Sequence, residues 1–198
     1  MTGYIIHHKS TLYNGIRADL YQNDPYVWFA PYLWSFCHLN QNPKVERGMT
    51  VLWITKAGGT FVCDLVFVVK EILPFREALS IYRGRDAGLA RLHFENGMAA
   101  HPEVMREKAK TYVADMGRSY IPHPSVPIEV EVDRLRLKEN PKAKPLAVVC
   151  SRRSPPLKAK AIDELEKFVF TNAQQHYRGA LGSLELSQAQ SCTSKAQC

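Results

Sequence analysis

The sequence has few cysteines and no two of them at short spacing. Its five cysteines, Cys37, Cys63, Cys150, Cys192 and Cys198, are odd in number and far apart. A disulfide framework needs pairs, and a zinc site needs closely spaced ligands, so neither is indicated. We therefore expect a reducing, cytoplasmic compartment.

Long hydrophobic runs are also missing. The longest, "LVFVV" at 65–69, has the length of a strand, whereas a membrane helix needs ~20 residues. The opening "MTGYIIHHKS" has no basic segment followed by a long apolar one, so we expect no secretory signal. No membrane partner is expected.

Motifs of high chemical specificity are absent as well. The sequence contains no HExxH, GxSxG or P-loop pattern, and each of these would mark a particular catalytic or phosphate site. His7 and His8 would point to opposite faces of a strand, so they do not form one metal site. We expect no metal ligand, no cofactor and no assignable catalytic residue, which disfavours metal catalysis and hydrolysis by serine or cysteine.

What remains is an ordinary globular composition with a basic balance. Hydrophobic residues make up 45% of the 198 residues, and the formal net charge is +7. We expect a single domain over residues 1–181 and a polar, disordered tail over 182–198. The positive charge suits a polyanionic partner such as DNA or RNA, and it also suits a protein without one.

The strongest structural signal is a β-hairpin. "TVLWIT" and "TFVCDLVFVVKEIL" are apolar and rich in β-branched residues, and the "KAGG" between them supplies glycine for a tight turn. The order of the other elements favours an α+β fold, with a bent, mostly antiparallel sheet or an open β-barrel flanked by helices. Further strands are expected at 3–8, 128–137 and 145–150, and helices at 74–84, at 102–116 and after Ser154–Pro155.

Aromatic residues cluster in "PYVWFAPYLWSFCHLN" at 25–40. Trp28, Phe29 and Trp34 offer rings on which a nucleobase could stack, and Ser35 and Asn40 offer groups that read a base edge. The alternative is that the rings fill the core and the polar residues serve as turns or caps.

The hairpin carries a second group of candidate ligand-binding residues. Trp53 is placed in mid-strand, Lys56 at the end of that strand, and Asp64 within an apolar strand. A charge in such a strand must be paired or face a cavity. Lys56 is a phosphate contact, an activated amine or a solvated turn residue.

A basic stretch follows in the last third of the chain. Arg136, Arg152, Arg153 and Lys158 are its candidate phosphate-binding residues, and part of the stretch precedes a predicted helix, whose N–H groups favour anions. A solvated surface is the alternative.

The run "KVERGMTVLWITKAGGTFVCDLVFVVKEIL" resembles the core of PUA-like domains, the group that contains the ASCH, EVE and YTH families. The preceding "FAPYLWSFCHLNQNPKVERG" is similar to segments of nucleotide-modification-associated domains, and "VPIEVEVDRLRL" matches a returning barrel strand. The resemblance implies an open barrel whose aromatic cavity recognises a modified or flipped base. Trp28, Trp34 and Trp53 would form its walls and Gly48 would open the strand, although Met49 stands where many relatives have an acidic residue.

Three functions follow as hypotheses. The first is a module that binds a modified or extruded base of DNA or RNA. The second is an ASCH-like amidohydrolase that acts on a modified nucleoside and uses Lys56 with Asp64 or Glu71 for proton transfer. The third is a protein-interaction domain with the aromatic segment as its interface. The sequence does not indicate the oligomeric state.

Overall fold

The structure is a computed structural model that describes residues 2–7, 12–13, 16–17, 35–38, 45–74, 77, 110–149 and 157–178. Its backbone divides into two compact units. The first unit comprises residues 1–10, 45–69 and 115–178, and the second comprises residues 11–44, 70–114 and 179–198. Each unit therefore combines segments that are distant in the sequence.

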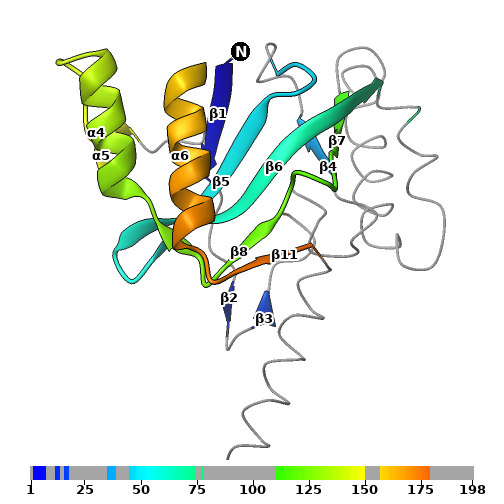
Figure 1. Ribbon diagram of the computed structural model, residues 1–198, viewed down its shortest axis with the longest axis horizontal. Helices are drawn as coiled ribbons and strands as arrows, with labels where there is room; N and C mark the ends of the chain where they lie inside the picture. The colour runs from blue at the N-terminus through cyan, green and yellow to red at the C-terminus, as the bar shows by residue number, and fades with distance from the viewer. Residues whose placement is uncertain are drawn as a thin grey trace, which may run out of the picture. The chain divides into compact units, whose positions relative to one another are not determined.

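The sheet of the first unit is built around the predicted hairpin (Figure 1). Strand β5 (Thr50–Ala57) pairs antiparallel with β6 (Thr60–Pro74), and the exposed turn between them contains Gly58 and Gly59 at φ of 57° and 89°. Positive φ is the conformation that glycine adopts without steric cost. The hairpin is thus confirmed, together with the reason for its turn.

Strand β1 (Thr2–His7) runs parallel to β5 and lies between β5 and the short β10 (Leu157–Lys158). The strand order in this unit is β10-β1-β5-β6, and β9 (Val126–Pro127) pairs with β6. All of these pairs are antiparallel except β1–β5. The strand predicted near the start of the sequence is confirmed.

A β-bulge interrupts the hairpin at Asp64. Trp53 is opposite Leu65, while the next residue, Ile54, is opposite Cys63, so Asp64 is the extra residue. Side chains alternate along paired strands, and the shift of register allows both flanking segments to stay buried. A bulge bends the strand and re-aims the side chains beside it.

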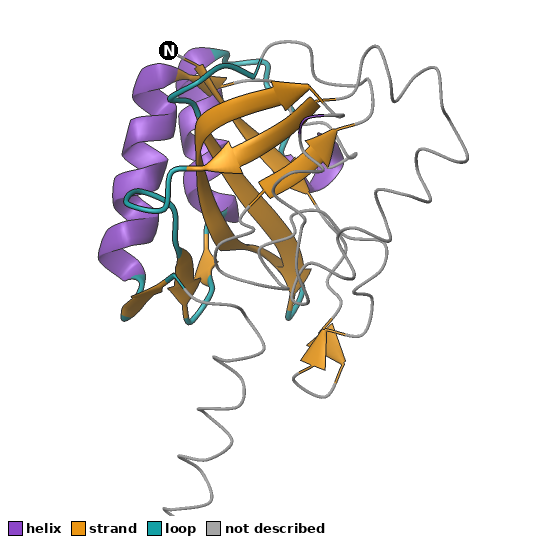
Figure 2. Cartoon of the chain, turned by 90° about the vertical axis from the view of Figure 1, so that its right-hand side faces the viewer, coloured by secondary structure: helices purple, strands orange, loops and turns teal. Residues whose placement is uncertain are grey.

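Helices α4 (Glu129–Glu139) and α6 (Ala159–Asn172) cover one face of this sheet (Figure 2). The core between the layers includes Leu52 and Ile54 of β5 and Leu165 of α6, each fully buried. Burying a side chain of this size contributes about 1.5–3 kcal/mol. The opposite face of the hairpin is buried as well.

The strand predicted at 128–137 is wrong, because this segment forms α4. Ile128, Val132 and Leu135 are buried, at a spacing of four and three residues, which is the period of one helix face. Val130 is 84% exposed and Leu137 is 49% exposed. The alternating pattern of apolar residues therefore included both buried and exposed positions. The segment is a helix and does not supply the barrel strand that the resemblance implies.

The strand predicted at 145–150 is also wrong. Leu146–Val149 forms the short helix α5, and Asp133 on α4 fixes its start by accepting a 2.6 Å hydrogen bond from the Leu146 N–H. A short apolar run does not distinguish a strand from a buried helical turn. The helix expected after Ser154–Pro155 is α6, which begins at Ala159 and follows β10.

The first unit also contains a small separate pair of strands. Strand β8 (Ile121–His123) pairs antiparallel with β11 (Gln175–Tyr177), which directly follows α6. The Gln174 N–H donates a hydrogen bond to the His123 carbonyl at 3.0 Å. This pairing fixes the end of α6 and the residues just after it.

In the second unit, β2 (Leu12–Tyr13) pairs with β3 (Ile16–Arg17), and β4 (Ser35–His38) pairs with β7 (Lys110–Ala114). The helix expected at 102–116 is wrong at its end, because β7 occupies that part of it. "KTYVA" contains the β-favouring Thr, Tyr and Val in sequence. Residues 101–109, most of the 74–84 helix and the predicted tail lie outside the described residues.

The observed fold is therefore a mixed α+β fold with a mostly antiparallel sheet, as predicted. Its described strands follow a linear order that does not close into a barrel. In the parts of the chain that the structure describes, no helix is long and apolar enough to span a membrane.

Candidate functional site

Helix α6 positions the candidate site because its two faces differ in composition. Ala161, Ile162, Leu165 and Val169 form the face that is buried against the sheet, with the spacing of an amphipathic helix. At its end, the Ala173 N–H donates to the Val169 carbonyl at 3.0 Å. The buried face fixes the rotation of the helix, and this determines which side chains line the pocket beside it.

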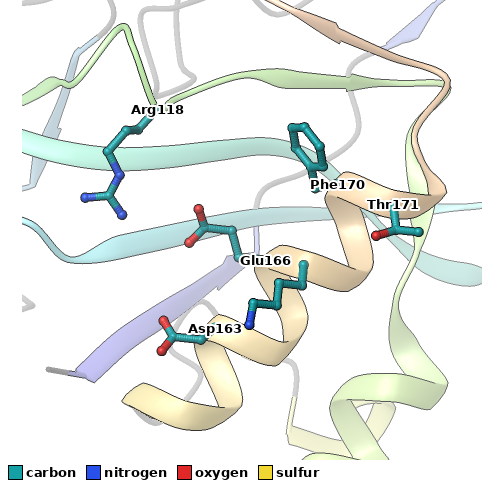
Figure 3. Close-up of a pocket in the computed structure, with 6 residues that line it drawn as sticks. Arg118, Asp163, Glu166, Phe170 and Thr171 are labelled. Atoms are coloured by element: carbon teal, nitrogen blue, oxygen red, sulfur yellow. The ribbon is translucent and has the colours of Figure 1, made fainter.

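The neighbouring face of α6 lines a pocket of about 340 Å³ (Figure 3). Phe170 lies at one end of the pocket and Arg118 at the other, with the Glu166 carboxylate between them. The lining residues combine two cations, two carboxylates, a hydroxyl and one aromatic ring: Arg118, Asp163, Glu166, Lys167, Phe170 and Thr171.

Arg118 reaches the pocket from a tight turn after β7. The Asp115 carbonyl accepts a 2.7 Å hydrogen bond from the Ser119 N–H, and the Asp115 carboxylate accepts one from the Gly117 N–H at 3.0 Å. Ser119 in turn accepts a hydrogen bond from the Val68 N–H at 2.9 Å, which anchors the turn to β6. Arg118 itself is exposed and makes no ion pair within the described residues, so its charge is available to a ligand.

The Glu166 side chain is held by the sheet. The Thr50 hydroxyl donates a hydrogen bond to Glu166 Oε2 at 2.9 Å, and the Tyr120 hydroxyl is 3.5 Å from the Glu166 carbonyl, to which it donates. Burial, and then the negative charges that Cys63 and Glu166 can carry, raise the pKa of Tyr120 above its ordinary value. The phenol therefore remains a neutral donor at physiological pH.

Three aromatic rings meet at the Phe170 end of the pocket. Phe170 stacks on His176 of β11, with ring centroids 3.8 Å apart and planes inclined by 12°. Tyr120 contacts both rings edge-on, at 5.7 Å from Phe170 and 5.0 Å from His176. Since Phe170 is still 51% exposed, its stacked partner orients a large apolar surface that is open to solvent.

A smaller cavity of about 130 Å³ adjoins the first one. Arg118 and Asp163 line both cavities, so the two share a border at the start of α6. Gly48, Met49 and Thr50 form the sheet side of the smaller cavity, and Gly48 has a φ of 81°. A ligand longer than the first pocket would therefore extend toward the start of β5.

The pocket combines groups that donate hydrogen bonds with groups that accept them. Asp163, Glu166, Arg118 and Lys167 balance in formal charge, so the pocket suits a ligand with both donor and acceptor groups. The residues that the structure describes contain no group of three or more His, Cys, Asp or Glu side chains placed to hold a metal. Cys63 is buried, and desolvation together with the charge of Asp64 raises its pKa, which leaves the thiol unreactive.

Most of the predicted aromatic site lies outside the described residues. This applies to Trp28, Phe29, Trp34 and Asn40, and equally to Arg152 and Arg153. Ser35 is the first residue of β4, opposite Val113 of β7. The structure gives the backbone position of Ser35 only.

The hairpin residues are described but do not meet in one site. Trp53 and Asp64 are buried, with 2% and 4% of their surfaces exposed, whereas Lys56 is exposed near the turn, opposite Phe61. Asp64 is three positions beyond Phe61, which is about 10 Å along a strand. Lys56 and Asp64 thus lie in different environments.

Two predicted phosphate-binding residues are also described. Lys158 is exposed in β10, directly before α6. Arg136 is half-buried on α4, and its Nη1 atom is buried without a hydrogen-bond partner among the residues described.

The pocket residues on α6 were not predicted from the sequence, although their spacing indicates that they share one face of a helix. Asp163, Glu166, Lys167 and Phe170 recur at positions i, i+3, i+4 and i+7, so they share one face of the helix. Phe170 is out of phase with the buried stripe, and this marks it as an aromatic residue on the polar face. No sequence pattern places Arg118 beside these residues, because its approach to the pocket depends on tertiary structure.

Comparisons with protein-family models, with curated proteins and with solved structures found no match to this chain.

Proposed function

We propose that this protein is a binding module for a nucleobase, presented either by a nucleotide or by an unpaired position of DNA or RNA. The observation that carries the proposal is the exposed Phe170 ring, held by the His176 stack at the rim of a pocket whose far end has a guanidinium. An aromatic face and a nearby cation are the two elements that bind a base and its phosphate.

The geometry accommodates such a ligand in one orientation. A base would stack on Phe170 with its polar edge facing Glu166, and Arg118 and Lys167 would be the cations available to its acceptor groups and to a phosphate. Stacking of one base on an aromatic side chain contributes about 1–3 kcal/mol. The phosphate contact would add salt-dependent affinity, in keeping with the net charge of +7.

Two predictions from the sequence are compatible with a nucleobase-binding module. We propose a PUA-like relationship for the fold, and recognition of a modified or extruded base for the function. The aromatic segment at 25–40 remains a proposed second contact for the nucleic acid. The described residues that line the Phe170 pocket lie within 118–171.

The amidohydrolase hypothesis lacks comparable support. An amine that acts as a base or nucleophile at neutral pH needs desolvation or a neighbouring charge. Lys56 is exposed near a turn, and Asp64 is buried further along the next strand. No described feature favours proton transfer between them.

The first test is the substitution Phe170→Ala, with Leu137→Ala as its matched control. Both side chains are about half exposed. Phe170→Ala also removes the stack on His176, which is worth about 0.5–1.5 kcal/mol, so thermal unfolding must show that each variant is folded. We expect Phe170→Ala to weaken binding of a fluorescein-labelled single-stranded oligonucleotide about 5- to 150-fold in anisotropy titrations, which corresponds to the loss of one stacked base. Leu137→Ala should leave the affinity unchanged. Equal affinities for the two variants, or no binding by the intact chain at low salt, would refute the proposal.

A further inference from the structure

The charged groups in the pocket with Phe170 divide into hydrogen-bond acceptors and hydrogen-bond donors. Glu166 presents its carboxylate between the ring and Arg118, and Asp163 contributes a second carboxylate. Carboxylates only accept hydrogen bonds, whereas Arg118 and Lys167 only donate them. A complementary ligand must therefore offer donors to the carboxylates and an acceptor or anion to the cations.

Glu166 is suited to recognise a pair of donors rather than a single one. Thr50 donates to Oε2, and this bond orients the carboxylate without using all of its capacity, because the two oxygens have about four lone-pair sites. Oε1 has no hydrogen-bond partner within the described residues. A planar ligand edge with two adjacent N–H groups can therefore bind this carboxylate in a bidentate manner.

The four common bases differ in this respect. Guanine has two adjacent donors, the ring N1–H and the exocyclic N2 amino group, and next to them the O6 acceptor. The Watson–Crick edges of adenine and cytosine each have one amino donor beside a ring nitrogen acceptor, which a carboxylate would repel. The single N–H of uracil or thymine lies between two carbonyl acceptors. Only guanine thus matches a carboxylate that is flanked by a cation.

We propose that the pocket selects guanine, with Glu166 accepting from N1–H and N2–H while the base stacks on Phe170. O6 then faces the cationic side of the pocket, and Thr50 acts as the positioning residue for the carboxylate. This inference rests on the proposed function, because it specifies the base that the same site binds. It adds a specificity that stacking alone does not provide, since every base has a π face.

The test is a calorimetric titration of the full chain with GMP, IMP, AMP, CMP and UMP. IMP is the most informative comparison, because hypoxanthine differs from guanine only in lacking the N2 amino group. A bidentate contact discriminates by about 1–3 kcal/mol, so we expect GMP to bind about 5- to 150-fold more tightly than IMP. The same titrations with Glu166→Gln, which can still accept from Thr50, should abolish this preference. Glu139→Gln, a glutamate on α4 outside the pocket, is the matched control and should retain it.

The titrations distinguish guanine selection from nucleobase binding in general. A GMP preference that disappears in Glu166→Gln and persists in Glu139→Gln supports guanine selection. Similar affinities for all five nucleotides, each weakened by Phe170→Ala, would overturn guanine selection and leave the nucleobase site intact. A preference for CMP or AMP that depends on Glu166 would likewise overturn it. No binding of any nucleotide or oligonucleotide would overturn both.

Discussion

The two faces of helix α6 differ in what they contribute to the molecule. On one face, Leu165 and Val169 are fully buried against the sheet. On the other face, Glu166 and Phe170, each the next residue in the sequence, line an open pocket. The first face has no group that could recognise a ligand, and the second removes little apolar surface from water.

This difference shows how a single helix can provide both stability and a site. The buried face fixes the helix, so the pocket face needs few bonds of its own to hold its residues in place. Thr50 and Tyr120 connect the pocket face to the sheet and its neighbouring strand through two hydrogen bonds. Substitutions on the two faces should therefore affect different measurements.

The largest effect is expected for Leu165→Ala on the buried face. Leu165 has 0% exposed surface, and truncating such a residue removes its contacts and leaves a cavity, at a cost of about 2–5 kcal/mol. Urea denaturation should show the loss as a lower midpoint with an unchanged slope. Leu137→Ala, in which the leucine is 49% exposed, should shift the midpoint far less. Similar shifts for the two variants would contradict the assignment of the buried face.

The next effect is expected for Gly3→Ala on β1, which presses on the same buried face from the sheet side. A Cβ at position 3 would lie 2.6 Å from the Thr50 carbonyl oxygen and 2.7 Å from Ile162 Cγ1. Such overpacking costs about 1–3 kcal/mol, which thermal unfolding would report. In the control Gly117→Ala, the nearest atom would be Asp115 Oδ1 at 3.3 Å, so a smaller loss is expected. An unchanged unfolding temperature for Gly3→Ala would show that β1 does not approach α6 this closely.

A smaller effect on stability, but a specific one on binding, is expected for Thr50→Val. It removes the hydrogen bond to Glu166 on the pocket face, and Thr60→Val removes the equivalent 3.1 Å bond from β6 to Glu129 of α4. Each loss should cost about 1 kcal/mol in chemical denaturation. Only Thr50→Val should also reduce the preference for GMP over IMP. A similar reduction in Thr60→Val would mean that Thr50 has no specific positioning role.

The smallest effect concerns the link between α6 and α4 and depends on pH. Arg134 donates to Glu131 at 2.8 Å and also pairs with Glu164 of α6 at 3.3 Å. The hydrogen bond from Arg134 lowers the pKa of Glu131. Stability from this pair is therefore present above the ordinary glutamate pKa and is lost as the pH falls through the lowered one.

Glu131→Gln removes this contribution. At neutral pH it should destabilise the protein by less than about 1 kcal/mol, because water screens an exposed pair. The difference from the unmodified chain should shrink as the pH is lowered in a series of denaturation curves. A difference that grows on acidification would contradict the pKa direction.

The elements predicted correctly from the sequence are those in which the local residue preferences favour the same structure as the tertiary packing. The hairpin combines β-branched strands with a Gly-Gly turn, and both signals indicate the same structure. The segment at 128–137 was mispredicted because two periods coexist in it. Its Val130 and Leu137 complete an alternating pattern, yet both are exposed, and only the positions with helical spacing are buried.

The candidate site was less predictable than the fold, for a physical reason. Phe170 and Glu166 share a helix face, and this could be derived from their spacing. The approach of Arg118 depends on a turn fixed by Ser119 and β6, and the role of Thr50 depends on strand β5 lying beside α6. These contacts join residues that are 51 and 116 positions apart, and their pattern leaves no trace in local sequence.

The position of β1 has a consequence for the order in which the protein folds during synthesis. This strand is made before both of its neighbours in the sheet, β5 and β10, the latter at Leu157–Lys158. The hairpin β5–β6 can form from adjacent residues, whereas β1 gains its second edge only when the last third of the chain has left the ribosome. Until then β1 exposes an unpaired edge, at which a nascent chain is open to chaperones and to mispairing.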